Sequence, residues 1–217
     1  MSRGIVVLGN APSLNKKFLD KYDLFKNDIV IACNHFYLSG ITPTYLCISD
    51  VNFFVNSKCS PEKLFKNLKT TFVITEKLFE LYRKYFDENS KVVICDVVKG
   101  NGMEYPKFPT VLETHGTLTT LSFPLAFELL KQNSHLNRCI LVIGVDQKQE
   151  KLHFYKEPNL NFEEINRTRQ RLGRRPMDWV EYRQSLEHDE TTKQLITLEF
   201  QNMKSIFEKN NYIIQII

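Results

Sequence analysis

The sequence predicts an α/β fold: a single Rossmann-like, doubly wound and mostly parallel sheet with a small lid insertion. Short β-branched apolar runs bounded by turn residues recur along the chain, and such runs are typical of buried parallel strands. Helical segments alternate with these runs, and one polar segment interrupts the alternation. Sheets of this kind bind ligands outside the carboxyl ends of their strands, so the segments that follow strands are the candidates for function.

Each apolar run is predicted to be a strand, and the segments between them to be helices. The last two helices carry apolar residues at helical spacing, as in Leu121, Leu125 and Leu129. The expected strands are Ile5–Leu8, Asp28–Cys33, Tyr45–Ser49, Thr71–Thr75, Lys91–Cys95, Cys139–Ile143 and Tyr212–Ile216, and the expected helices are Pro61–Leu68, Glu76–Phe86, Thr117–Lys131 and Glu190–Glu208.

The chain divides into a core, a lid and a return to the core. Residues 1–146 are expected to form the Rossmann-like core, and residues 190–217 add a final helix and strand to it. Between them, residues 147–189 are polar, aromatic and basic, with five arginines from Arg167 to Arg175. An insertion of this kind over the strand ends is typical of a substrate lid.

Composition favours a single globular domain that binds anions. The 217 residues are 42% hydrophobic and carry a net charge of +4, which suits nucleotides or acidic glycans but is too small to indicate nucleic-acid binding. No segment approaches the roughly 20 apolar residues of a membrane span, and no signal-peptide apolar region is present. We expect a soluble cytoplasmic protein that could dock on a membrane carrying its substrate.

The five cysteines indicate a reducing compartment. They are odd in number, widely spaced and without a CxxC pair, so neither a disulfide framework nor a zinc site is expected. Four of them stand in or beside apolar runs, where cysteine usually acts as a small buried hydrophobe. These four are Cys33, Cys47, Cys95 and Cys139.

The loop after the first strand is the leading candidate for ligand binding. Gly9 permits a tight turn, and exposed N–H groups before a helix make a natural anion site. Asn10 and Ser13 add polar side chains, and Pro12 lies between them. The loop matches neither GxGxxG nor a Walker loop. The alternative is a simple turn capped by Ser13.

Polar residues also follow the second and third expected strands. Asn34 begins the string CNHFY, whose polar and aromatic side chains suit the edge of a base or sugar site. Asp50 and Asn52 follow the third strand and faintly resemble a DxD metal motif, although a lone carboxylate is weak support for a metal. The alternative for Asp50 is an ordinary surface turn.

Three later loops complete the candidate site. The string Thr114-His115-Gly116 opens a long helix, where Thr114 or His115 could cap the helix or the helix start could stabilise a phosphate. Asp146 ends an apolar strand and either presents a carboxylate to a ligand or caps its loop. His188 precedes the final helix, whose positive end favours the neutral imidazole of a general base; an exposed histidine is the alternative.

These loops resemble those of a known family in their sequence motifs and in the order of the motifs. The strings GNAPSL, CNHFY, THG and IGVD resemble the GNGPSL, CNxFY, TSG and SGID motifs of the bacterial sialyltransferases of glycosyltransferase family 42. The segment HDETTKQLITLEF resembles a family segment in which a histidine precedes a helix. A related group of Rossmann-like proteins, including pterin pyrophosphokinases, shares GxGPSL and a strand ending in G-x-D.

The resemblance implies a metal-independent transferase that needs no cofactor beyond its CMP-activated sialic acid donor. By position, Asn10, Ser13 and Asn34 would hold the donor nucleotide, together with Asp50 or Asn52. The remaining roles fall on the THG turn and the lid. Thr114, His115 and Gly116 would meet the donor phosphate, His188 would be the general base, and Tyr155 and Tyr182 would stabilise the departing phosphate.

The sequence departs from the family in places that concern the acceptor. Leu112 and Glu113 stand where the family carries an acceptor-binding arginine, and THG replaces TSG, so an imidazole is expected at the phosphate. The expected partners are the donor and a glycan acceptor hydroxyl, with no nucleic acid, and the resemblance implies a homo-oligomer. Two alternatives remain: a pyrophosphokinase-like phosphotransferase using ATP and Mg²⁺ through Asp50 and Asp146, and a non-catalytic nucleotide- or glycan-binding module.

Overall fold

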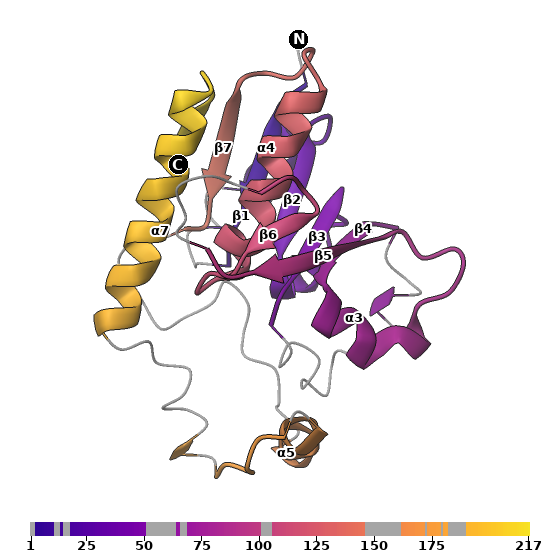
Figure 1. Ribbon diagram of the computed structural model, residues 1–217. Coiled ribbons are helices and arrows are strands. Elements are labelled where there is room, and N and C mark those ends of the chain that lie inside the picture. The colour runs from indigo at the N-terminus through magenta and orange to yellow at the C-terminus, as the bar shows by residue number, and fades with distance from the viewer. Residues whose placement is uncertain are drawn as a thin grey trace.

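The sheet has the predicted parallel arrangement. The computed structural model describes residues 3–10, 14, 18–50, 64–65, 69–100, 106–145, 162–171, 173–178, 180–181 and 190–217. They contain a single sheet of eight strands in the order β6-β5-β4-β3-β2-β1-β7-β8, and every neighbouring pair is parallel (Figure 1). The strands are β1 Ile5–Leu8, β2 Ile29–Cys33, β3 Tyr45–Ile48, β4 Thr71–Thr75, β5 Val92–Val98, β6 Thr110–Leu112, β7 Cys139–Ile143 and β8 Ile213–Ile216. The predicted α/β class is confirmed.

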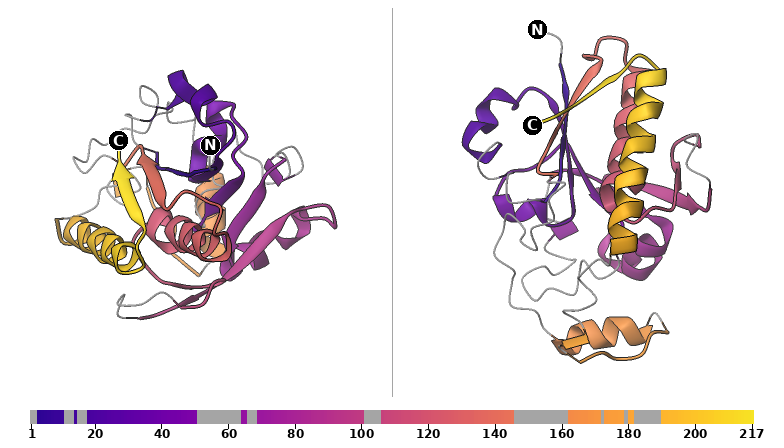
Figure 2. Two further views of the ribbon diagram at one scale, coloured as in Figure 1. Left: turned by 90° about the horizontal axis from the view of Figure 1, so that it is seen from above. Right: turned by 90° about the vertical axis from the view of Figure 1, so that its left-hand side faces the viewer.

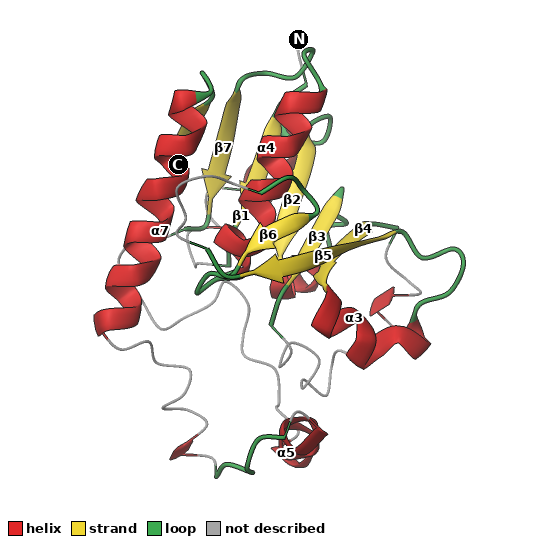
Figure 3. Cartoon of the chain, in the orientation of Figure 1, coloured by secondary structure: helices red, strands yellow, loops and turns green. Residues whose placement is uncertain are grey.

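Helices lie between the strands in chain order (Figure 3). The expected helix Glu76–Phe86 is divided at Tyr82, and the helix expected over Thr117–Lys131 begins with a π-helical turn. Of the helix expected over Pro61–Leu68, only residues 64–65 are described. The helical elements are η1 Leu19–Leu24, η2 Asn34–Ser39, α3 Glu76–Tyr82, η4 Arg83–Tyr85, η5 Leu118–Ser122, α4 Phe123–Gln132, α5 Phe162–Arg171 and α7 Glu190–Lys209.

Alternating side chains of each strand feed two separate cores. In β1, Val6 and Leu8 pack toward η1, η2 and α3, whereas Ile5 and Val7 pack toward α4 and α7. All four side chains are buried, which explains why the strand reads as an uninterrupted apolar run. The helices on the two sides make a three-layer arrangement, with η1 across the sheet from α4 and α7 (Figure 2).

The α4–α7 layer is held together by aromatic rings. Phe207 of α7 lies 5.2 Å from Phe127 and 6.2 Å from Phe123 of α4, measured between ring centroids and with edge-to-face geometry. Phe123 and Phe207 are fully buried, so the two helices share one core against the sheet. This packing fixes where α7 runs past the start of α4.

The described parts of the expected lid include one helix. The helix α5 lies on the side toward which the arrow of β7 points, beyond the carboxyl end of that strand (Figures 1 and 2). Its Asn166 is tied to Met177, whose backbone donates to the Asn166 Oδ1 at 2.9 Å and accepts from its Nδ2 at 3.0 Å. The lid boundaries at 147–189 stay a prediction. None of the helices in the described ranges is long and apolar enough to cross a membrane.

Candidate functional site at the carboxyl ends of the strands

The strand order places a switch point at β1. The chain passes from β1 to β2 on one side, while β7 pairs with β1 on the other. Loops that leave neighbouring strands in opposite directions open a place for a ligand between them, outside the carboxyl ends. Gly9 and Asn10 follow β1 and Gly144 follows β7, and we call these three residues the switch-point edge.

Two glycines let the backbones meet at the switch-point edge. The N–H of Gly9 donates to the carbonyl of Ile143 at 2.9 Å. A Cβ on Gly9 would lie 2.2 Å from the carbonyl oxygen of Gly144, a distance that no real side chain tolerates. Gly144 has a φ of +73°, and a Cβ there would lie 3.0 Å from the Cβ of Leu14. The edge therefore requires glycine at both positions, because the two backbones lie buried against each other.

Asn10 carries an unsatisfied oxygen at this edge. Its Oδ1 is buried and has no hydrogen-bond partner. Leaving a buried acceptor without a donor costs about 1–3 kcal/mol, so native proteins rarely keep one without a reason. A donor on a bound ligand, such as an amino group or a hydroxyl, would remove that cost. Among the predicted site residues that the structure describes, Asn10 is thus the one whose side chain lacks a hydrogen-bond donor.

Asn34 is held by a chain of hydroxyls that the sequence analysis did not predict. It follows β2 with a φ of +49°, in the left-handed region that asparagine tolerates better than most residues. The Thr117 hydroxyl donates to the Asn34 Oδ1 at 3.1 Å. Because that proton is used, the 2.6 Å contact between Ser49 and Thr117 must have the Ser49 hydroxyl as donor. The chain joins the ends of β2 and β3 to the start of η5.

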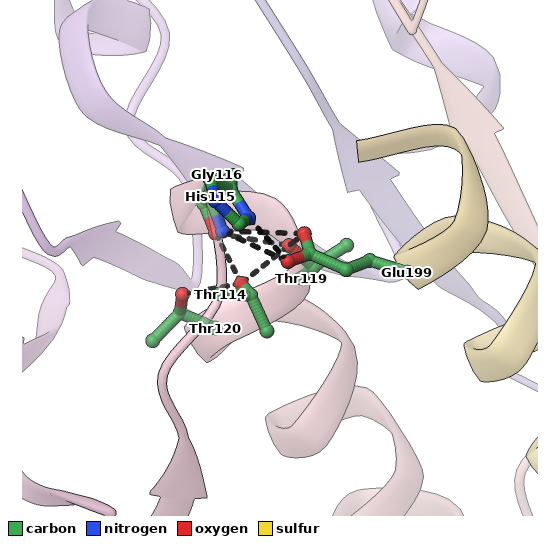
Figure 4. Close-up of polar contacts among 6 residues, drawn as sticks. All are labelled: Thr114, His115, Gly116, Thr119, Thr120 and Glu199. Carbon is green, nitrogen blue, oxygen red and sulfur yellow. Dashed lines mark hydrogen bonds and ion pairs between the residues drawn. The ribbon is translucent and has the colours of Figure 1, made fainter. Parts of the chain in front are cut away.

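Of the two alternatives for the THG string, the cap of the long helix is not formed. Neither Thr114 nor His115 caps it: the residue before η5 is Thr117, whose side chain makes no capping bond. Thr114 turns inward, with its hydroxyl 3.2 Å from the carbonyl of Gly116 and 2.6 and 2.7 Å from the hydroxyls of Thr119 and Thr120 (Figure 4). The hydroxyl is therefore satisfied within its own turn.

A carboxylate from α7 meets the helix start. Both oxygens of Glu199 accept from the backbone N–H of His115 at 3.2 Å, and Oε1 lies 2.6 Å from the His115 Nδ1 (Figure 4). The hydroxyl of Thr119 lies 3.5 Å from Oε2. The positive end of the helix attracts a negative group, and here a side chain of the protein supplies it. No sequence signal pairs His115 with Glu199, because 84 residues separate them.

The thiols on the α4–α7 side of the sheet are buried and inert. Cys33 and Cys47 are register partners on β2 and β3, and Cys95 lies on β5. Burial raises the pKa of the Cys33 and Cys95 thiols to about 12 and that of Cys47 still further. These cysteines are free, as is Cys139. Cys33, Cys47 and Cys95 act as small buried hydrophobes, as predicted, and not as nucleophiles, whereas Cys139 is only half-buried.

Some of the remaining predicted residues are described by the structure, and others lie outside the described residues. Asp50 follows β3 and is exposed. In the expected lid, the Arg175 guanidinium donates to both carboxylate oxygens of Glu181, at 2.6 and 3.2 Å, so it is already paired. Across the described ranges, no three His, Cys, Asp or Glu side chains come together as a metal site. Seven predicted site residues lie outside the described residues: Pro12, Ser13, Asn52, Asp146, Tyr155, Tyr182 and His188.

Comparison with known proteins identifies no relative of this chain. No family model, no curated protein and no solved structure matches the chain. The fold therefore rests on the sheet itself, and the function on the chemistry of the strand ends.

Proposed function

We propose that the chain is a glycosyltransferase that binds a CMP-activated sialic acid, or a related nonulosonic acid, and transfers the sugar to a glycan hydroxyl. The nucleotide would lie over the switch-point edge, at the position where doubly wound sheets bind such ligands. The observation that carries the proposal is the buried, unsatisfied Oδ1 of Asn10 beside the close approach of Gly9 and Gly144. A ribose hydroxyl or a base amino group would supply the missing donor.

The amide of Asn34 supports the same location. Its Oδ1 accepts from Thr117, so the orientation of the amide is fixed before any ligand arrives. No described residue accepts from its Nδ2, which stays available as a donor to the ligand. Preorganised donors of this kind favour binding because little side-chain entropy is lost when the ligand arrives. The chemistry proposed for Tyr155, Tyr182 and His188 rests on the sequence resemblance alone.

The test is a ligand panel read by thermal unfolding. CMP is expected to stabilise the protein, by about 2.7 kcal/mol when its concentration is 100 times the dissociation constant, and UMP by less. ATP with Mg²⁺ is expected to have no effect. A reaction of a CMP-activated sialic acid with oligosaccharide acceptors, followed by mass spectrometry, is expected to show the added sugar.

Each alternative has its own outcome. Stabilisation by ATP and Mg²⁺ but not by CMP would overturn the proposal in favour of a phosphotransferase. Binding of the CMP-sugar without transfer or hydrolysis would indicate a binding module. Stabilisation by neither nucleotide would remove the nucleotide site altogether.

A further inference from the structure

The contact between His115 and Glu199 selects one tautomer of the neutral imidazole ring. The distance from Nδ1 to Oε1 is 2.6 Å, and an ionised carboxylate can only accept a hydrogen bond. Nδ1 must therefore carry the proton, and in the neutral ring Nε2 carries the lone pair. The pair comes from the start of one helix and the middle of another, brought together by the packing of α4 and α7 (Figure 4).

Glu199 is itself held in place for this task. Its oxygens accept from the backbone N–H of His115 and lie 3.5 Å from the hydroxyl of Thr119. Its side chain is 19% exposed, whereas that of His115 is 43% exposed. The carboxylate is thus partly shielded and fixed, while the imidazole stays open to solvent or to a ligand. No described residue forms a hydrogen bond with Nε2.

The imidazole lies on the same rim as the proposed nucleotide site. Two residues after His115, Thr117 bonds to Asn34 at the end of β2 and to Ser49 at the end of β3. Asn34 is therefore linked through a single hydroxyl to the helix start that carries His115. An imidazole whose Nδ1 is bound to a carboxylate, and whose Nε2 carries the lone pair in the neutral ring, has the arrangement of a general base with an orienting carboxylate.

We infer that His115 is a general base of this protein, with Glu199 as its positioning residue. The inference rests on the proposed glycosyl transfer and names its proton acceptor. The O–H bond of the acceptor hydroxyl breaks as Nε2 takes the proton, and the oxygen forms a bond to the anomeric carbon of the donor. The bond from that carbon to the phosphate oxygen breaks, and its electron pair leaves with CMP. The imidazolium, stabilised by Glu199, then returns its proton to water.

This assignment competes with His188, which the sequence resemblance implies as the base and which lies outside the described residues. The two histidines are separated by comparing His115→Ala and His188→Ala. Loss of a general base lowers kcat by about 10²–10⁴-fold, and we expect that loss for His115→Ala with KM nearly unchanged. Added imidazole is expected to restore part of the rate to His115→Ala only.

Glu199→Gln is expected to lower kcat by up to about 10⁴-fold, because an amide can donate to Nδ1 and so favours the wrong tautomer of the histidine. Two matched controls should leave the rate unchanged. Glu208→Gln lies on the same helix, in an exposed pair with Lys204, and His135→Ala lies before the amino end of β7. Thermal unfolding of each variant shows whether it folds as the wild type does.

A spectroscopic readout tests the pair without activity. Two-bond ¹H–¹⁵N correlation spectra of the histidine rings are expected to show His115 as the Nδ1–H tautomer in the wild type and as a mixture in Glu199→Gln. An Nε2–H tautomer in the wild type would overturn the inference. An active wild type whose His115→Ala variant keeps its full rate would overturn it alone, whereas a wild type that transfers no sugar would overturn the proposed function as well.

Discussion

The rim of the sheet has two parts that differ in hydrogen bonding. We call the part with an unsatisfied polar group the open part, and the part whose hydroxyls are satisfied the closed part. At the switch-point edge, Gly9 and Gly144 lie buried against each other, and the buried Oδ1 of Asn10 has no hydrogen-bond partner. At the ends of β2 and β3, by contrast, the Thr117 hydroxyl bonds to both Ser49 and Asn34, and nearby the Thr114 hydroxyl bonds to Thr119 within its own turn. The first part lacks a hydrogen-bond donor that a ligand could supply, whereas the hydrogen bonds of the second part are already complete.

This difference separates binding from positioning. A polar group that stays unsatisfied in the free protein stabilises a complex when a ligand pairs with it. A network that is already satisfied loses a partner if a ligand intrudes, so it acts best as a rigid support. We therefore expect loss of the unsatisfied Asn10 amide to change affinity, and loss of a satisfied hydroxyl to change stability or rate.

The largest effect is expected where the open part admits no side chain. Gly9→Ala would place a Cβ 2.2 Å from the Gly144 carbonyl, and the two strand ends would have to separate. The expected loss is about 3 kcal/mol of unfolding free energy, at the upper end for overpacking. Urea denaturation measures it. Gly116→Ala is the control, since its Cβ would meet only Thr119 at 3.7 Å, and equal losses in both variants would contradict the account.

A second effect concerns the buried core beneath the rim, on the α4–α7 side of the sheet. The buried thiols of Cys33 and Cys95 have a pKa of about 12, against an ordinary 9.0, so the unfolded chain releases these protons at lower pH than the folded one. Their contribution to stability is fully present below pH 9 and is lost as the pH rises toward 12. At pH 10 the loss is about 1.4 kcal/mol for each thiol.

The measurement for the thiols is the unfolding free energy at pH 8 and pH 10. The wild type is compared with the Cys33→Ala/Cys95→Ala double variant, which is expected to fall less steeply with pH. Iodoacetamide labelling at pH 8, mapped by mass spectrometry, is expected to spare both thiols in the folded protein. Rapid labelling of either thiol would show that it is not buried in the folded protein.

The sequence predicted the regular elements well and the pairing between distant ones poorly. The strands β1, β4 and β7 lie at their predicted bounds because an uninterrupted buried run such as IVVL has little choice of structure. The short strand β6 was missed, since three residues, one of them buried, carry almost no pattern. Short 3₁₀ segments such as η1 lack a helical period for the same reason.

For the site, the local sequence predicted which positions reach the carboxyl edge of the sheet, but not which residues they bond to. Asn10 and Asn34 were found because polar residues directly after strands reach the carboxyl edge. Thr117 and Glu199 were missed, because their roles depend on how α4 and α7 pack, which no spacing along the chain encodes. The alternative of a local cap by Thr114 or His115 failed for the same reason. Glu199, from a distant helix, accepts from the His115 N–H instead.

The most direct test of the account is a calorimetric titration of CMP into the wild type and Asn10→Ala. We expect the variant to bind about tenfold more weakly, equivalent to about 1.4 kcal/mol, with an unfolding free energy no lower than that of the wild type. Asn89→Ala, in an exposed turn, should bind as the wild type does. Equal affinity of Asn10→Ala and wild type, or no binding to either, would contradict a nucleotide site at the switch-point edge.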